Sequence, residues 1–343
     1  MQAAVAEEQR PNDSIGGADA VEHAMLCEMR PATAVSFIFG KPVDLTNIQR
    51  LCSRKTIGEQ FSKQVFIMPF LGVSGMQYSG ASLAGSRILL VEDSNLFTSM
   101  IRAKLKELLD IDVETCRNFE ELQLAYDKSS EPIKLAISNM NLPGAEKGEA
   151  LTYLVDLSIP TIAFTGTFLE GMRDELIAKD VVDYILKDNI FAVDMLAESI
   201  CRFLTNHRHH VLIVDDSPTA RALLSSRLKR YNFRVSVAES GAKALELLKA
   251  NPDIGLMVTD YNMPDMDGFD LTRRIRATTG SHELRIIGVS SSNNRLLSAR
   301  FLKAGGNDFI LRPFIDEEFY CRVNQNLDTL LQIQSARRVR ETA

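Results

Sequence analysis

An internal repeat constrains the fold of this chain more than any other feature. Each copy begins with a short apolar run that ends in two acidic residues and a serine. Four segments recur at an offset of about 120 to 125 residues: 87–94 with 210–217, 135–143 with 256–264, 161–165 with 286–290, and 183–187 with 308–312. Four matches at nearly one offset are hard to produce by chance. The chain therefore contains a duplicated unit, which we call the first unit (87–206) and the second unit (209–329).

Within the second unit, apolar runs rich in β-branched residues alternate with segments of helical spacing. The runs are 210–215, 233–238, 254–259, 284–290 and 308–312. Near-continuous apolar strands that alternate with helices are typical of a parallel sheet covered on both faces. We therefore predict an α/β fold with two doubly wound, five-stranded, flavodoxin-like sheets in tandem. Ligands of such sheets bind at the carboxyl ends of the strands.

The composition of the 343 residues argues against several classes of protein. Lys and Arg number 39 against 45 Asp and Glu, and the net charge of -6 does not favour nucleic-acid binding. No apolar run approaches the roughly 18 residues of a membrane span, and the acidic start of the chain does not resemble a secretory signal. The five cysteines are scattered and never form CxxC, so we expect reduced thiols rather than disulfides or zinc. These features together predict a cytoplasmic protein without a membrane partner.

Polar side chains follow the predicted strands of the second unit at their carboxyl ends. Asp215 and Asp216 follow the first strand, Asp260 the third, Ser290 the fourth and Arg312 the fifth. Three converging carboxylates would repel one another unless a hard cation lay between them, and oxygen ligands suit Mg²⁺. A cation there would let one carboxylate attack phosphorus and form an aspartyl phosphate. The hydroxyl and the guanidinium would then hold the phosphoryl oxygens.

With these residues, the second unit resembles the receiver domain of two-component response regulators. The resemblance rests on Asp215-Asp216, on 260–264 (DYNMP) followed by Gly268, on Ser290, and on 312–314 (RPF). It implies that a sensor histidine kinase or a phosphotransfer protein phosphorylates this unit. A downstream output protein would receive the signal by protein–protein contact.

The resemblance also implies a role for each site residue. Asp260 would be the phosphoacceptor, and it would bind Mg²⁺ together with Asp215, Asp216 and the backbone carbonyl of Asn262. Ser290 and Phe309 stand at the positions of the switch hydroxyl and the switch aromatic residue. The departure is Arg312, because the family has lysine there, and arginine is planar and longer.

The first unit has the same pattern with one change. Glu92 and Asp93 form the acidic pair, and Thr165 and Lys187 match the hydroxyl and the lysine of the family. Asn139 occupies the acceptor position, and a neutral amide is a poor nucleophile. We therefore expect a degenerate receiver that serves as a docking or dimerisation surface. Binding of an unrecognised ligand is the alternative.

The paired arrangement resembles the tandem receivers that precede diguanylate cyclase domains in bacterial regulators. The segment 305–309 (GGNDF) is similar to the cyclase signature, but it lies in the turn before the last strand of the second unit. We therefore predict a response regulator without an enzymatic output domain. The alternative is the regulatory part of a diguanylate cyclase-type regulator whose catalytic domain is missing from this chain.

The segments outside the two units are less constrained. We expect 1–86 to be a partly disordered extension with an amphipathic helix over 45–66, and 330–343 to be a helical tail. The apolar run 65–71 is expected to pack onto the receivers or onto a partner. A homodimer through the tail or the first unit is left open.

Overall fold

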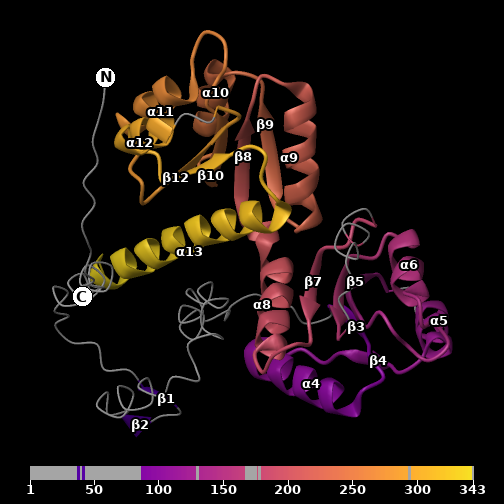
Figure 1. Ribbon diagram of the computed structural model, residues 1–343. Coiled ribbons are helices and arrows are strands. Elements are labelled where there is room, and N and C mark those ends of the chain that lie inside the picture. The colour runs from indigo at the N-terminus through magenta and orange to yellow at the C-terminus, as the bar shows by residue number, and fades with distance from the viewer. Residues whose placement is uncertain are drawn as a thin grey trace, which may run out of the picture. The chain divides into compact units, whose positions relative to one another are not determined.

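The computed structural model describes residues 86–128, 131–166, 176, 179–292 and 295–341, together with two short strands nearer the amino terminus (Figure 1). Those strands, β1 (Phe37–Ile38) and β2 (Lys41–Pro42), pair antiparallel. The helix expected over 45–66 and the apolar run 65–71 lie outside the described residues. The same holds for most of the expected extension over 1–86.

The first unit forms a five-stranded parallel sheet with the strand order β4-β3-β5-β6-β7. Its described elements are β3 (Arg87–Val91), α4 (Asn95–Leu109), β4 (Glu114–Cys116), α5 (Phe119–Lys128), β5 (Ile133–Ser138), α6 (Glu149–Asp156), β6 (Thr161–Thr165), β7 (Asp183–Leu186) and α8 (Ala192–Thr205). Successive strand side chains point to opposite faces. Ile88 and Leu90 accordingly pack in the core under α4 and α8, whereas Leu89 and Val91 pack under α5 and α6.

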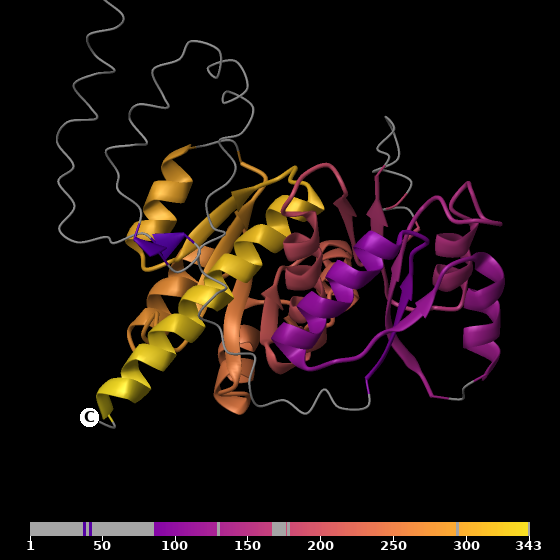
Figure 2. The ribbon, with the colours of Figure 1, turned by 90° about the horizontal axis from the view of Figure 1, so that it is seen from below.

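The second unit repeats this architecture with the order β12-β11-β10-β8-β9. Its elements are β8 (His210–Val214), α9 (Pro218–Arg230), β9 (Arg234–Ala238), α10 (Gly241–Ala250), β10 (Ile254–Asp260), α11 (Gly268–Arg276), β11 (Arg285–Ser290), α12 (Arg295–Lys303), β12 (Asp308–Leu311) and α13 (Asp316–Glu341). Helices α9 and α13 cover one face, and α10, α11 and α12 cover the other (Figures 1 and 2). The predicted fold class is confirmed.

The repeated serine that follows the two acids begins the next helix. Ser94 caps α4, where its Oγ accepts a hydrogen bond from the backbone N–H of Phe97 at 3.4 Å. Ser217 caps α9 in the same way, accepting from the N–H of Ala220 at 3.3 Å. Such a cap satisfies a donor that the first helical turn leaves without a partner. The motif thus ends a strand at the acids and starts a helix directly after them.

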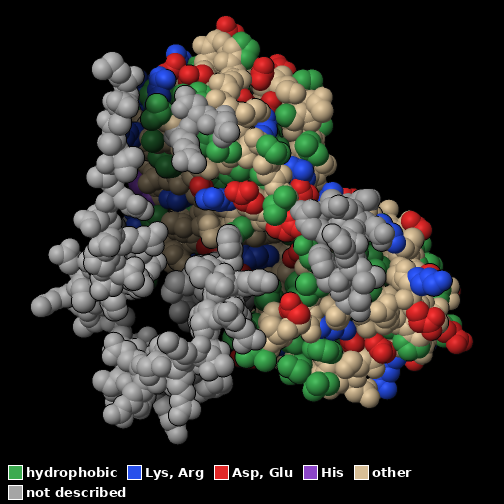
Figure 3. All heavy atoms as spheres, viewed as in Figure 1, with side chains coloured by type: hydrophobic (Ala, Val, Ile, Leu, Met, Phe, Trp, Pro, Cys, Tyr) green, Lys and Arg blue, Asp and Glu red, His purple; other side chains and the backbone are tan. Residues whose placement is uncertain are grey.

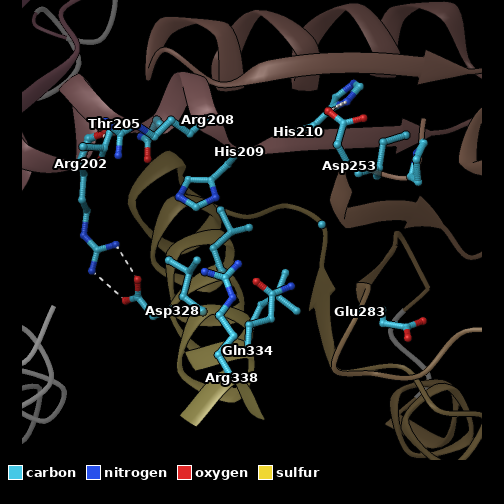
Figure 4. A pocket seen from close by; sticks show the side chains of 17 residues that line it. Arg202, Thr205, Arg208, His209, His210, Asp253, Glu283, Asp328, Gln334 and Arg338 are labelled. Atoms are coloured by element: carbon cyan, nitrogen blue, oxygen red, sulfur yellow. Dashed lines mark hydrogen bonds and ion pairs between the residues drawn. The ribbon is translucent and has the colours of Figure 1, made fainter. Parts of the chain in front are cut away.

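The short 3₁₀ turn η2 (Asn206–Arg208) joins α8 to β8 and so connects the units. Across this junction the guanidinium of Arg202 forms two hydrogen bonds to the carboxylate of Asp328, at 3.1 and 2.8 Å (Figure 4). The hydroxyl of Tyr184 donates to Glu317 at 3.0 Å. The partners Asp328 and Glu317 both lie on α13. This helix therefore packs on its own sheet and also contacts the first unit.

No described helix is both long enough and apolar enough to cross a lipid bilayer.

Candidate functional site

The predicted site residues of the second unit gather at one edge of its sheet. Asp215 directly follows β8, Asp260 ends β10, Ser290 ends β11, and Arg312 directly follows β12. The four strands are parallel neighbours, so their carboxyl ends meet at this edge. Asp215, Asp260 and Ser290 are all buried. Asp216 is exposed at the same edge.

Backbone groups hold Asp260 in place. Its Oδ2 accepts a hydrogen bond from the N–H of Asn262 at 2.8 Å, and its carbonyl accepts from the hydroxyl of Thr259 at 3.0 Å. The N–H of Gly268 reaches back to the carbonyl of Tyr261 at 3.0 Å. A Cβ at Gly268 would lie 2.5 Å from the carbonyl oxygen of Asp260, which is too close. The glycine in the motif is therefore needed for close approach of the backbone to the site.

Arg312 joins the two buried carboxylates. Its Nη2 lies 2.9 Å from Oδ2 of Asp215, and its Nη1 lies 3.0 Å from Oδ1 of Asp260. Its backbone N–H donates to the carbonyl of Ser290 at 2.8 Å, which fixes the start of the 312–314 segment beside β11. The planar guanidinium fork is suited to this double contact.

Burial is the main influence on the acidity of Asp260. Desolvation raises the pKa of its carboxyl, and the negative charges of Asp215 and Asp216 act in the same direction. The N–H of Asn262 and the charge of Arg312 lower the pKa in part. A cation at this edge would stabilise the ionised form that a nucleophile requires.

The two predicted switch residues occupy different surroundings. The Oγ of Ser290 accepts a hydrogen bond from the N–H of Ser292 at 3.1 Å, and the side-chain amide of Asn262 lies 3.5 Å from it. Phe309 is half-buried, and its ring centroid lies 5.5 Å from that of Phe301 and 6.2 Å from that of Tyr261. Ser290 thus faces the acidic edge, whereas Phe309 packs beside the core under α10, α11 and α12.

The residues at this edge fit a hard divalent cation in their chemistry. Asp215, Asp216, Asp260 and the carbonyl of Asn262 offer oxygen donors, which Mg²⁺ prefers. The described residues nevertheless contain no group of three or more His, Cys, Asp or Glu side chains that is already arranged as a metal site. Here the guanidinium of Arg312 contacts both buried carboxylates.

The equivalent edge of the first unit has a different set of contacts. Lys187 and Glu92 form a buried ion pair, with Nζ 2.6 Å from Oε2. Desolvation raises the pKa of Glu92, and the bonded Lys187 offsets part of this effect. The amide of Asn139 donates to Oδ1 of Asp93 at 3.0 Å. Thr165 is buried at the end of β6. The acceptor position therefore holds the neutral amide of Asn139. The ammonium of Lys187 at the same edge is already paired with the carboxylate of Glu92.

Sequence reasoning missed one residue at the site of the second unit. Arg221, on α9, donates from Nη1 to the backbone carbonyl of Asp215 at 2.6 Å. It lies one helical turn after the capping Ser217, but nothing in its sequence context distinguishes it from a surface arginine. It adds a second positive charge near the acidic edge.

A separate cavity of about 540 Å³ lies at the opposite edge of the same sheet (Figure 4). Its walls come from the junction of the units, the starts of β8 and β10, and α13. They include Arg208, His209, His210, Asp253, Gln334 and Arg338. His210 hydrogen-bonds Asp253 and Ser236. This cavity contains none of the predicted site residues.

Figure 3 shows charged side chains of both signs mixed over the visible surface.

Comparison with known proteins agrees with the geometry. A family model described as the response regulator receiver domain matches residues 211–324. The chain belongs to the two-component response regulators. Two curated relatives are the two-component response regulator ORR5 of Oryza sativa subsp. japonica and the chemotaxis protein CheY1 of Helicobacter pylori (strain J99 / ATCC 700824). Each is 39% identical and covers 30% of this chain, over 104 residues (78% of ORR5) and 105 residues (85% of CheY1).

Solved structures extend this response-regulator relationship across both units. Two structures described as two-component system response regulator/GGDEF domain proteins are 33% identical to this chain. Each match covers 71% of this chain and 99% of the solved chain, with TM-scores of 0.66 and 0.65. The expected resemblance to tandem receivers is therefore confirmed. No catalytic output domain is identified among the described elements or by the matching family model.

Proposed function

We propose that the second unit accepts a phosphoryl group on Asp260 and that the first unit does not. The donor would be the phosphohistidine of a sensor kinase or of a phosphotransfer protein, and the signal would leave by protein–protein contact with an output protein. The observation that carries this proposal is the cluster of Asp215, Asp260 and Arg312 at the carboxyl edge of the sheet. Membership of the response regulator family supports it.

In the proposed reaction, an oxygen of Asp260 attacks the phosphorus of the donor. An O–P bond forms while the bond from phosphorus to the donor nitrogen breaks, and the imidazole leaves with the bonding electrons. Mg²⁺, when bound by Asp215, Asp216, Asp260 and the carbonyl of Asn262, would neutralise charge on the phosphoryl oxygens. Arg312 and the hydroxyl of Ser290 would contact those oxygens as well, and the hydrogen bond from Arg312 to Asp260 supports this role for the arginine. Phe309 would respond to any movement of this edge, because it packs between Tyr261 and Phe301.

The first unit lacks the nucleophile for this reaction. Asn139 is neutral and is already hydrogen-bonded to Asp93. Lys187, the counterpart of Arg312, is paired with Glu92. We therefore propose that the first unit serves as a docking surface. Its contacts with α13 through Tyr184 and Arg202 support this role.

Labelling of the full chain with an acyl phosphate tests the proposal. We expect Mg²⁺-dependent label in the wild type, no label in Asp260→Asn, and no label after chelation of Mg²⁺. Asp265→Asn is the matched control, because it makes the same chemical change at an exposed position of the same loop. Undiminished label in Asp260→Asn, or loss of label in Asp265→Asn alone, would contradict the assignment.

The alternative function, the regulatory part of a diguanylate cyclase-type regulator, is not favoured. The GGDEF description belongs to the two matched proteins, and the aligned part covers the two units. In this chain 305–307 lie in the turn that leads into β12, and 308–309 are the first residues of that strand.

A further inference from the structure

Arg312 contacts two of the three carboxylates that are proposed to bind the metal, namely Asp215 and Asp260. The distances are 2.9 Å to Asp215 and 3.0 Å to Asp260. The side chain of Asp215 is only 3% exposed and that of Asp260 only 9%, whereas that of Arg312 is 25% exposed. Solvent therefore screens these ion pairs much less than pairs on an open surface.

Each of the two carboxylates has one oxygen bound by the backbone and one bound by Arg312. Oδ1 of Asp215 accepts from the N–H of Ser217 at 2.9 Å, and Oδ2 of Asp260 accepts from the N–H of Asn262 at 2.8 Å. The remaining oxygens, Oδ2 of Asp215 and Oδ1 of Asp260, both accept from the guanidinium. Mg²⁺ binds carboxylate oxygens directly, at about 2.0 to 2.1 Å. Mg²⁺ and the guanidinium of Arg312 therefore compete for the same carboxylate oxygens.

The first unit shows why arginine differs from lysine here. Lys187 stands at the equivalent position after β7, and its ammonium pairs with one carboxylate among the described residues, that of Glu92. An ammonium is a compact point charge, whereas the guanidinium fork has two outer nitrogens that reach separate acceptors. The arginine in the second unit can thus neutralise both acids at once.

We propose that Arg312 is a built-in competitor of Mg²⁺ that sets how much metal the second unit needs. Metal binding requires the guanidinium to leave Asp215, Asp260 or both. A site that is competent in only a fraction of molecules has an apparent dissociation constant raised by the inverse of that fraction. A phosphoryl group on Asp260 would then give the released Arg312 a new anionic partner. This inference rests on the proposed metal-dependent phosphorylation and adds a specificity-determining role for one residue.

Calorimetric titration of the full chain with MgCl₂, without a phosphoryl donor, tests the inference. We expect Arg312→Lys to lower the apparent dissociation constant by about threefold and Arg312→Gln by about tenfold, because the lysine retains one contact and the glutamine loses the charge. Arg322→Gln is the control, since it removes an arginine of α13 that pairs with Asp308 instead. Its dissociation constant should match that of the wild type.

Three results would overturn the inference. The first is Mg²⁺ binding by the wild type with unchanged or weaker binding by both Arg312 variants. The second is an equal increase in Mg²⁺ affinity in Arg322→Gln and Arg312→Gln. The change in net charge alone would then explain the tighter binding. Absence of Mg²⁺ binding in every variant would refute both the metal site and the competition. Acyl phosphate labelling of the wild type with Mg²⁺ tests the proposed function by itself. Normal label together with unchanged Mg²⁺ affinity in the Arg312 variants would refute the competition alone. If Arg312→Gln does not fold, Arg312→Lys still tests the inference, because it keeps the positive charge.

Discussion

In the first unit a buried lysine pairs with a single carboxylate, whereas in the second unit an arginine pairs with two. The two sheets have the same strand order, and in each unit a serine at the equivalent position caps the helix that follows the first strand, α4 or α9. The difference thus lies in side chains at the carboxyl edge rather than in the fold. A duplicated domain can keep its scaffold while a few residues decide whether its site holds a nucleophile.

The largest difference should appear when the cation of the first unit is removed. Lys187→Met leaves the buried Glu92 without a countercharge, with only the N–H of Ser94 still donating to it, and breaking a buried pair in this way costs about 3 to 5 kcal/mol. We expect a loss of about 3 kcal/mol in the free energy of unfolding at pH 7, measured by urea denaturation. The loss should shrink at lower pH, because burial raises the pKa of Glu92 and a protonated Glu92 needs no cation.

The matched variant Lys187→Arg retains the charge and should lose much less stability. Mg²⁺ should not recover the stability of Lys187→Met. A change of less than about 1 kcal/mol in Lys187→Met would show that the pair contributes no more than a surface ion pair does.

Restoring the acceptor should make the two sites more alike. Asn139→Asp replaces a hydrogen bond to Asp93 with repulsion between two carboxylates. We expect the metal-free variant to lose about 2 kcal/mol, and added Mg²⁺ to recover stability by mass action. Calorimetry with and without Mg²⁺ measures both effects, and the first unit should then accept label from an acyl phosphate.

Asn95→Asp, at the exposed start of α4, is the control for added charge and should show no dependence on Mg²⁺. If Asn139→Asp folds but shows neither Mg²⁺ stabilisation nor label, the site of the first unit has been remodelled beyond its acceptor.

A smaller effect is expected at the contact between the units. Arg202 forms hydrogen bonds with both Glu198 and Asp328, so each bond carries only part of its interaction. A double-mutant cycle of Arg202→Ala and Asp328→Ala should give a coupling free energy of about 1 kcal/mol. Thermal unfolding of the four proteins measures it. Strict additivity of the two substitutions would mean that this contact does not hold the units together.

An effect of the same size should distinguish Asp183 from its counterpart Asp308. Burial raises the pKa of Asp183 to about 6, although Ser199 and the N–H of Tyr184 donate to its carboxylate. Asp308 instead pairs with Arg322. An acid with a raised pKa in the folded state binds its proton more tightly when folded, so its contribution to stability falls as pH rises from about 4 to 6.

Asp183→Asn should therefore be more stable than the wild type at pH 7, by about 1 kcal/mol, and the difference should close near pH 5. Asp308→Asn should be less stable than the wild type at pH 7 because it loses an ion pair. Thermal unfolding between pH 5 and 7 measures both differences. A constant offset for Asp183→Asn across this range would contradict the raised pKa.

The duplication was enough to predict the sheets, because repeated apolar runs and repeated turn signals reflect local and periodic constraints. It also predicted that Asp215, Asp260, Ser290 and Arg312 would meet, since parallel strands bring their carboxyl ends to one edge. It could not predict that Arg312 contacts both acids. That geometry depends on the rotamer of a long side chain and on which carboxylate oxygens the backbone already binds.

The contacts between the two units could not be predicted from the sequence either. Tyr184 and Glu317 are 133 residues apart, and neither lies in a motif that marks an interface. Tyr184 occupies the position that Phe309 has in the second unit, but its hydroxyl gives it a partner on α13. The continuous helix Asp316–Glu341 likewise joins the expected tail to the last helix of the second unit without a break.

We expect the second unit to carry the phosphoacceptor and the first unit to lack one. Borohydride reduction of the acyl phosphate-treated full chain, followed by mass spectrometry of peptides from both units, tests it most directly. Reduction converts an aspartyl phosphate to homoserine, so the modified position is read as a mass change. We predict homoserine at position 260 and no modified residue among the peptides of the first unit. Homoserine at another aspartate of the second unit, or at Asp93, would contradict the account.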